Sequence, residues 1–260
     1  MNSNIELKPE SKKPDLHLKW LYEILIKPRS TFQAVNQEKK NAWLIPLAAL
    51  SVLAILHAMV TAPIKRNMIQ MGLTTPPNFQ YYSPEQQAQF YNAQATQTSF
   101  LFLYVFPILF ALISIWLAWF LLSSILHLVL TLSGSHSPSL KSYNAVGWSM
   151  IPLGVRSIVQ IIAMLATRST INGAGLSGLF AADASGFTAY LAGFLGLIDV
   201  FFIWHAVFLI IGAHDFSGLT RKKVILATLG SIVIFMLIFA VPEFLKSILS
   251  NLSFGQYYFF

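Results

Sequence analysis

The chain of 260 residues contains no cysteine and few charged side chains. The absence of cysteine excludes disulfide bonds, thiolate metal sites, iron–sulfur ligation and a cysteine nucleophile. Charged residues make up only 10% of the sequence, whereas soluble domains carry about 25%. Hydrophobic residues make up 55% and the mean hydropathy is +0.62. This composition excludes an ordinary water-soluble protein and a disordered one, and it indicates a membrane protein.

Five apolar stretches are long enough to cross a bilayer, which takes about 20 residues per helix. They are Trp43–Thr61, Phe100–Leu132, Tyr143–Thr167, Phe187–Ala213 and Val224–Val241. Two crossings within the second stretch would need about 40 residues plus a turn, so we interpret it as one long helix. The sequence therefore predicts an all-α polytopic protein with five transmembrane helices. They occupy residues 43–246, between a polar and amphipathic segment at 1–42 and an aromatic tail at 247–260.

Lys and Arg residues are distributed unequally between the two sides of these spans. If the N-terminus is cytoplasmic, residues 1–42 and the loops 133–142 and 214–223 place twelve basic residues inside and leave four outside. Cytoplasmic loops carry the excess of Lys and Arg in membrane proteins. The first 17 residues show no cleavable signal peptide. We expect a multi-pass protein of the cell membrane with a cytoplasmic N-terminus and an extracytoplasmic C-terminus.

The net charge of +7 is also explained by this arrangement. In a soluble chain a strongly basic pI would suggest nucleic acid, but no nucleic-acid module is present. The basic residues lie beside membrane spans, so anionic lipid headgroups are the expected partner. The candidate headgroup-binding residues are Lys27, Arg29, Arg221, Lys222 and Lys223.

Two polar segments carry helical patterns of their own. In residues 17–36, Leu18, Leu21 and Leu25 recur at helical spacing, and Pro28 can start a second short helix. This segment either lies on the headgroups, which its flanking Lys and Arg favour, or packs beneath the bundle. In the polar segment 62–99, Ser83 is a candidate N-cap with Pro84 in the first turn.

Arg156 and Asp199 are the charged residues within the predicted spans. Counted from the cytoplasmic ends of their helices, they lie at depths of about 20 and 21 Å at ~1.5 Å per residue. A charge at the bilayer centre costs several kcal/mol without a partner. We therefore predict an intramembrane Arg156–Asp199 ion pair, in which replacing either residue with Ala destabilises more than replacing both.

His57 lies at a similar depth, and His205 follows Asp199 by six residues. A cluster of these two histidines with Arg156 and Asp199 has two interpretations. One is a proton relay or substrate site in a transporter, and the other, which we favour, is hydrogen bonding that fixes the bundle. No metal-ligand spacing and no nucleophile constellation are present; Gly175-Leu176-Ser177-Gly178 is a weak candidate in an outer loop. We expect no enzyme activity, no metal and no cofactor.

The order of several motifs resembles the Yip (Ypt/Rab-interacting protein) family, specifically its prokaryotic branch. The resemblance covers roughly residues 20–245 and rests on 25–32 (LIKPRSTF), 43–46 (WLIP), 143–152 (YNAVGWSMIP), 198–204 (IDVFFIW), Gly212 and 217–223 (SGLTRKK). It implies five transmembrane helices with a cytoplasmic N-terminus and supplies no catalytic residues. The Asp-Leu-Tyr-Gly-Pro motif that eukaryotic members carry before the first span is absent, which puts a Rab-related role in doubt.

Two functions are compatible with these features. The first is a non-enzymatic adaptor or membrane-organising module of Yip type, and the alternative is an accessory subunit of an ABC-type exporter or a small permease that uses the polar cluster. The corresponding protein partners are ABC transporter subunits or further copies of the same chain. A water-accessible cavity that reaches the polar cluster would favour the permease.

Overall fold

The computed structural model describes residues 18–38, 40–72, 75–76, 78–171, 175–180 and 185–252, and all regular elements within these ranges are helical. Residues 1–17 of the expected polar and amphipathic segment and residues 253–260 of the aromatic tail lie outside the described residues. The boundary expected between 246 and 247 lies inside a helix, α11 (Val241–Leu252).

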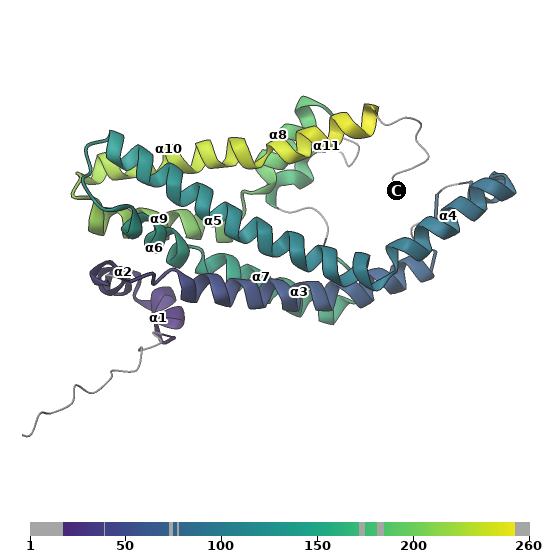
Figure 1. Cartoon of the computed structure of the whole chain (residues 1–260), viewed down its shortest axis with the longest axis horizontal. Helices are drawn as coiled ribbons and strands as arrows, with labels where there is room; N and C mark the ends of the chain where they lie inside the picture. The colour runs from purple at the N-terminus through teal and green to yellow at the C-terminus, as the bar shows by residue number, and fades with distance from the viewer. Residues whose placement is uncertain are drawn as a thin grey trace, which may run out of the picture.

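Five apolar helical segments of the described chain are long enough to cross a membrane, as predicted. They are α3 (Leu44–Gln70), the π-helical turn η2 (Leu101–Val105) with α5 (Phe106–Leu132), α6 (Ser139–Ser149) with α7 (Ile151–Thr167), α9 (Val200–Ser217), and α10 (Arg221–Phe239) with the start of α11. Figure 1 shows an elongated bundle with α1 (Trp20–Ile26) and α2 (Pro28–Gln37) at one end and α4 (Pro84–Gln97) at the other. We call these the N-terminal end and the far end.

The fourth span differs from its prediction as one helix over Phe187–Ala213. It is broken into α8 (Phe187–Gly196) and α9, and α8 packs against α11 and the short helix η3 (Gly175–Leu179). The break occurs because Asp199 has an extended backbone and its Oδ1 accepts a hydrogen bond from the Phe202 N–H at 2.7 Å. A short polar side chain that bonds the nearby backbone competes with the helical pattern, so the uninterrupted helix was a wrong prediction.

The third span is also interrupted, at Met150 between α6 and α7. Pro152 stands in the first turn of α7 and has no N–H to continue the hydrogen bonding of α6. The Leu153 N–H bonds the Met150 carbonyl, three residues back, which leaves the Ser149 carbonyl without a helical partner. Both interruptions lie inside the bundle, where a freed backbone group needs a side-chain partner.

The predicted start of α4 is confirmed. Ser83 caps the helix and forms a capping box with Gln86, and Pro84 is the first helical residue. Hydrogen bonds from its own backbone N–H and from the Ser83 hydroxyl lower the pKa of the Glu85 carboxyl. The negative charge is thus favoured at the helix N-terminus, where the helix dipole also favours it.

The N-terminal helices pack on the end of the bundle with one face. Trp20 and Ile24 of α1 and Phe32 and Val35 of α2 are buried, in one cluster with Trp148, Ile151 and Phe208. Tyr22 and Ile26 of α1 and Leu18 just before the helix are exposed, with exposed fractions of 59%, 71% and 54%. Of the two interpretations, the packing of this segment beneath the bundle is therefore present, and part of its apolar surface stays exposed.

Candidate functional site

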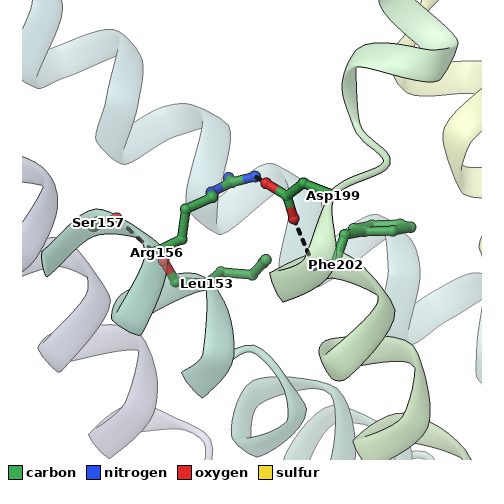
Figure 2. A network of polar contacts seen from close by, with 5 residues as sticks. All are labelled: Leu153, Arg156, Ser157, Asp199 and Phe202. Carbon is green, nitrogen blue, oxygen red and sulfur yellow. Dashed lines mark hydrogen bonds and ion pairs between the residues drawn. The ribbon is translucent and has the colours of Figure 1, made fainter. Parts of the chain in front are cut away.

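Arg156 and Asp199 meet between α7 and the break before α9 (Figure 2). Arg156 Nη1 donates to Asp199 Oδ2 at 2.9 Å, and the two side chains are 32% and 20% exposed. The ion pair that the sequence predicts is therefore present. The depth argument succeeds because Arg156 lies 17 residues after the start of α6 at Ser139, and Asp199 lies 18 residues before the end of α9 at Ser217.

Asp199 uses its two carboxylate oxygens for two different tasks. Oδ2 accepts from Arg156, while Oδ1 accepts from the Phe202 N–H and begins α9 (Figure 2). Ser157, the next residue after Arg156, bonds the Leu153 carbonyl and adds nothing to the pair. Arg156 thus holds α7 against the first turn of α9 through the residue that forms that turn.

His205 has a separate role and does not join the pair. Its ring is buried, and its Nδ1–H donates to the Ser149 carbonyl at 2.8 Å. This is the carbonyl that the break between α6 and α7 leaves without a helical partner. A histidine of the fourth span therefore satisfies a backbone group of the third span, which is a structural use of a polar side chain.

His57 stands apart from both groups. It lines a cavity of about 370 Å³ between α3, α5 and α7, together with Lys65, Ser157 and Gln160. Its ring makes no hydrogen bond to any residue in the described part of the chain. Of the four residues expected to cluster, the structure brings only Arg156 and Asp199 into direct contact.

Lys65 and Gln160 are residues of this cavity that the sequence did not indicate. Lys65 was counted only as an outer charge because the first span was expected to end at Thr61, whereas α3 continues to Gln70. Gln160 can be assigned to the cavity only from the packing of α7 against α3, which the sequence alone does not give. Among the described residues, no group of three His, Asp or Glu side chains could hold a metal ion.

The predicted basic residues lie at the N-terminal end of the bundle. Arg29 of α2 and Arg221 at the start of α10 line one hollow of about 300 Å³, with Gln33, His214 and Asp215. Asp215 Oδ2 accepts a hydrogen bond from Asn36 at 2.7 Å. Lys27, Lys222 and Lys223 are exposed and lie close to Arg29 or Arg221 in the sequence, but they do not line the hollow.

The comparisons with known proteins give one match. The family model described as the Yip1 domain matches residues 22–241, which include α2, the first four spans and most of the fifth, with the ion pair and the linings of both hollows. No curated protein and no solved structure matches the chain.

Proposed function

The chain belongs to the Yip family, and from that premise we propose that it is a non-enzymatic adaptor or membrane-organising module whose cytoplasmic face binds anionic lipid headgroups. The family and the five apolar helices make it a multi-pass membrane protein. The proposal adds which face is cytoplasmic and what that face binds.

The observation that carries this proposal is the hollow shared by Arg29 and Arg221. These residues are far apart in the sequence, and the docking of α2 on α9 brings them to one opening. Asp215 in the same hollow is hydrogen-bonded to Asn36. The lining therefore contains two guanidinium groups and one carboxylate. Arg is well suited to phosphate because its guanidinium offers paired N–H donors.

The exposed face of α1 supports the same orientation toward lipid. Leu18, Tyr22 and Ile26 follow one another at four-residue spacing and are all exposed, with Lys19 and Lys27 on the same segment. Apolar side chains flanked by Lys are typical of a helix lying at the headgroup boundary. The N-terminal helices would thereby bring Arg29 to the level of the phosphates.

The polar groups inside the bundle support an adaptor better than a permease. Arg156 is paired with Asp199, and His205 bonds the freed Ser149 carbonyl. Groups that hold helices together in this way are not available to pass a substrate or proton along. The cavity beside His57 is the one observation that favours the alternative, a small permease or an accessory subunit of an ABC-type exporter.

Lipid-dependent stability tests the headgroup proposal. The purified chain is titrated in mild detergent with phosphatidylglycerol or phosphatidylcholine, and its thermal unfolding midpoint is recorded. A ligand that binds the folded state raises the midpoint. We expect a rise with phosphatidylglycerol only, weaker at high salt, and a much smaller rise in the Arg29→Gln/Arg221→Gln variant.

Lys141→Gln is the matched control, since Lys141 is a basic residue near the same end of the bundle that does not line the hollow. If this control loses as much of the lipid effect as the double variant, general surface charge explains the effect and the hollow does not. If phosphatidylcholine stabilises equally, the headgroup proposal is wrong.

Affinity purification in mild detergent with mass spectrometry tests the adaptor role. Co-purification of ABC transporter subunits with the wild type would favour the alternative function. Recovery of the chain by itself, as an oligomer that requires Arg29 and Arg221, would support a membrane-organising module.

A further inference from the structure

The cavity between α3, α5 and α7 is built by features that recur in ligand sites. Its volume of about 370 Å³ is within the usual range for small-molecule pockets. One wall is made by η2, a single turn of π-helix, and by Pro107 at the start of α5. Such π-helical turns inside α-helices are frequent at functional sites.

The register of α3 and α7 places the polar residues of the cavity at two levels. Both helices run from the N-terminal end to the far end, and Thr61 Oγ1 contacts Met164 Sδ at 3.5 Å. The same offset puts His57 level with Gln160 and Ala54 level with Ser157. Lys65 lies two turns farther out, about 12 Å from His57 along the axis at ~1.5 Å per residue. The cavity thus has a neutral hydrogen-bonding floor and a cationic mouth.

Three polar side chains of the cavity make no hydrogen bond or ion pair in the described part of the chain. They are the His57 ring, the Gln160 amide and the Lys65 ammonium group, and all three belong to membrane-spanning helices. Polar groups inside a membrane are costly unless they are bonded, and those that line a cavity mark functional sites. The half-buried His57 ring and Gln160 amide are bonded by no neighbouring helix, so a molecule in the cavity can supply their partner, while the exposed Lys65 stands at the mouth.

The remaining walls are apolar and include Phe102, Leu103 and four alanines of α3 and α5. The charged residue of the lining is Lys65. A fitting ligand therefore carries one negative charge, an acceptor for neutral donors and an apolar body. We propose that this cavity binds a small amphipathic carboxylate, which enters past Lys65 and lies between α3, α5 and α7.

Octanoate is the probe for this site. Binding of radiolabelled octanoate is measured on the full chain in lipid nanodiscs, and uptake by empty nanodiscs is subtracted. We expect saturable binding that unlabelled octanoate displaces. Octylamine, which has the same chain and the opposite charge, should not displace it, and acetate, which lacks the apolar body, should displace it only at far higher concentration.

The Lys65→Met variant removes the cation that pairs with the carboxylate at the mouth of the cavity. We expect it to weaken octanoate binding by about tenfold or more, since a hydrogen bond to a charged group is worth ~1.5–3 kcal/mol. Arg66→Met is the matched control because it removes a neighbouring charge from the same helix without altering the lining.

Equal affinity in Lys65→Met and Arg66→Met, or displacement by octylamine as strong as by octanoate, would overturn the proposal. Displacement by acetate at the same concentrations would overturn the amphipathic class. This test is separate from that of the headgroup hollow, which lies at the other end of the bundle. Arg29→Gln/Arg221→Gln should leave octanoate binding unchanged, and Lys65→Met should leave the phosphatidylglycerol effect unchanged.

Discussion

Asp199 combines at one residue the two roles that a carboxylate has in a helical membrane protein. It begins α9 by accepting from the Phe202 N–H, and it neutralises Arg156 of α7. A substitution that removes only the charge can therefore be separated from one that removes the cap, because Asn caps helices about as well as Asp.

A double-mutant cycle measures the ion pair alone. Arg156→Met or Asp199→Asn singly leaves one charge without its partner, and we expect each to lower the free energy of unfolding by about 1–3 kcal/mol. The partial exposure of the pair keeps this below the ~3–5 kcal/mol of fully buried pairs. The double variant should be more stable than either single variant, as seen in thermal unfolding midpoints in detergent.

Asp199→Ala serves as the comparison for the cap. It should be less stable than Asp199→Asn by about 1 kcal/mol, because the Phe202 N–H also loses its acceptor. If the loss in the double variant equals the sum of the two single losses, the charges are not coupled and the interpretation of the pair is incorrect.

The sequence was sufficient for the ion pair but not for the partners of the histidines. Equal depth and opposite charge are readable from residue spacing, so Arg156 and Asp199 could be paired in advance. The acceptor of His205 is a backbone carbonyl that is free only because α6 ends before Pro152. The cavity of His57 depends on the register between α3 and α7, and this register is set by packing that no single helix encodes.

At the scale of elements, the docking of α2 on α9 depends on one close contact between the two helices. A Cβ atom at Gly212 of α9 would lie 2.8 Å from Cε1 of Phe32, which is fully buried in α2. The Phe32 ring also meets Phe208 edge-on, with centroids 6.4 Å apart. The glycine therefore makes room for the residue that anchors α2 to the bundle.

Gly212→Ala should loosen this anchor. Overpacking a buried contact costs about 1–3 kcal/mol, and here the cost is relieved when α2 moves off α9. We expect faster trypsin cleavage at Arg29 and Lys40, measured by mass spectrometry of timed digests of the full chain. The lipid effect that depends on Arg29 should weaken in parallel.

Gly230→Ala is the control within α10, because a Cβ there meets nothing within 4 Å. It should be neutral or stabilising by up to about 1 kcal/mol, since Ala favours helix over Gly. If both alanine variants digest at the same rate, the contact with Phe32 does not hold α2 in place.

The sequence predicted the number of spans better than their continuity. Apolar length is a property of each stretch alone, and it correctly indicated five crossings. The break at Asp199 was hidden because the residues on both sides are apolar and compatible with a helix. The extension of α3 to Gln70 was missed because its last turns are polar and continue the helix beyond the apolar stretch.

At the scale of the whole molecule, the third and fourth spans are both interrupted, and each is bonded by a side chain of the other at its interruption. The third span receives His205 at its break, and the fourth span receives Arg156 at its own. Each span therefore supplies the bond that the other lacks, and the bundle tolerates two helix interruptions without leaving the freed Ser149 carbonyl unbonded. This reciprocity ties the N-terminal end, where α9 also supports α2, to the middle of the bundle.

The orientation of this bundle in the cell membrane can be measured because the chain contains no cysteine of its own. Gln37→Cys at the N-terminal end and Asn92→Cys on α4 each introduce one exposed thiol outside the spans. The excess of Lys and Arg near the N-terminal end predicts that this end is cytoplasmic. A membrane-impermeant maleimide applied to intact cells should therefore label the Asn92→Cys variant and leave the Gln37→Cys variant unlabelled.

After permeabilisation both variants should react, which controls for the reactivity of each thiol. The reverse pattern in intact cells would place Arg29 and Arg221 outside the cell, and the proposed cytoplasmic headgroup site would then be wrong while the fold and the cavity between α3, α5 and α7 would remain.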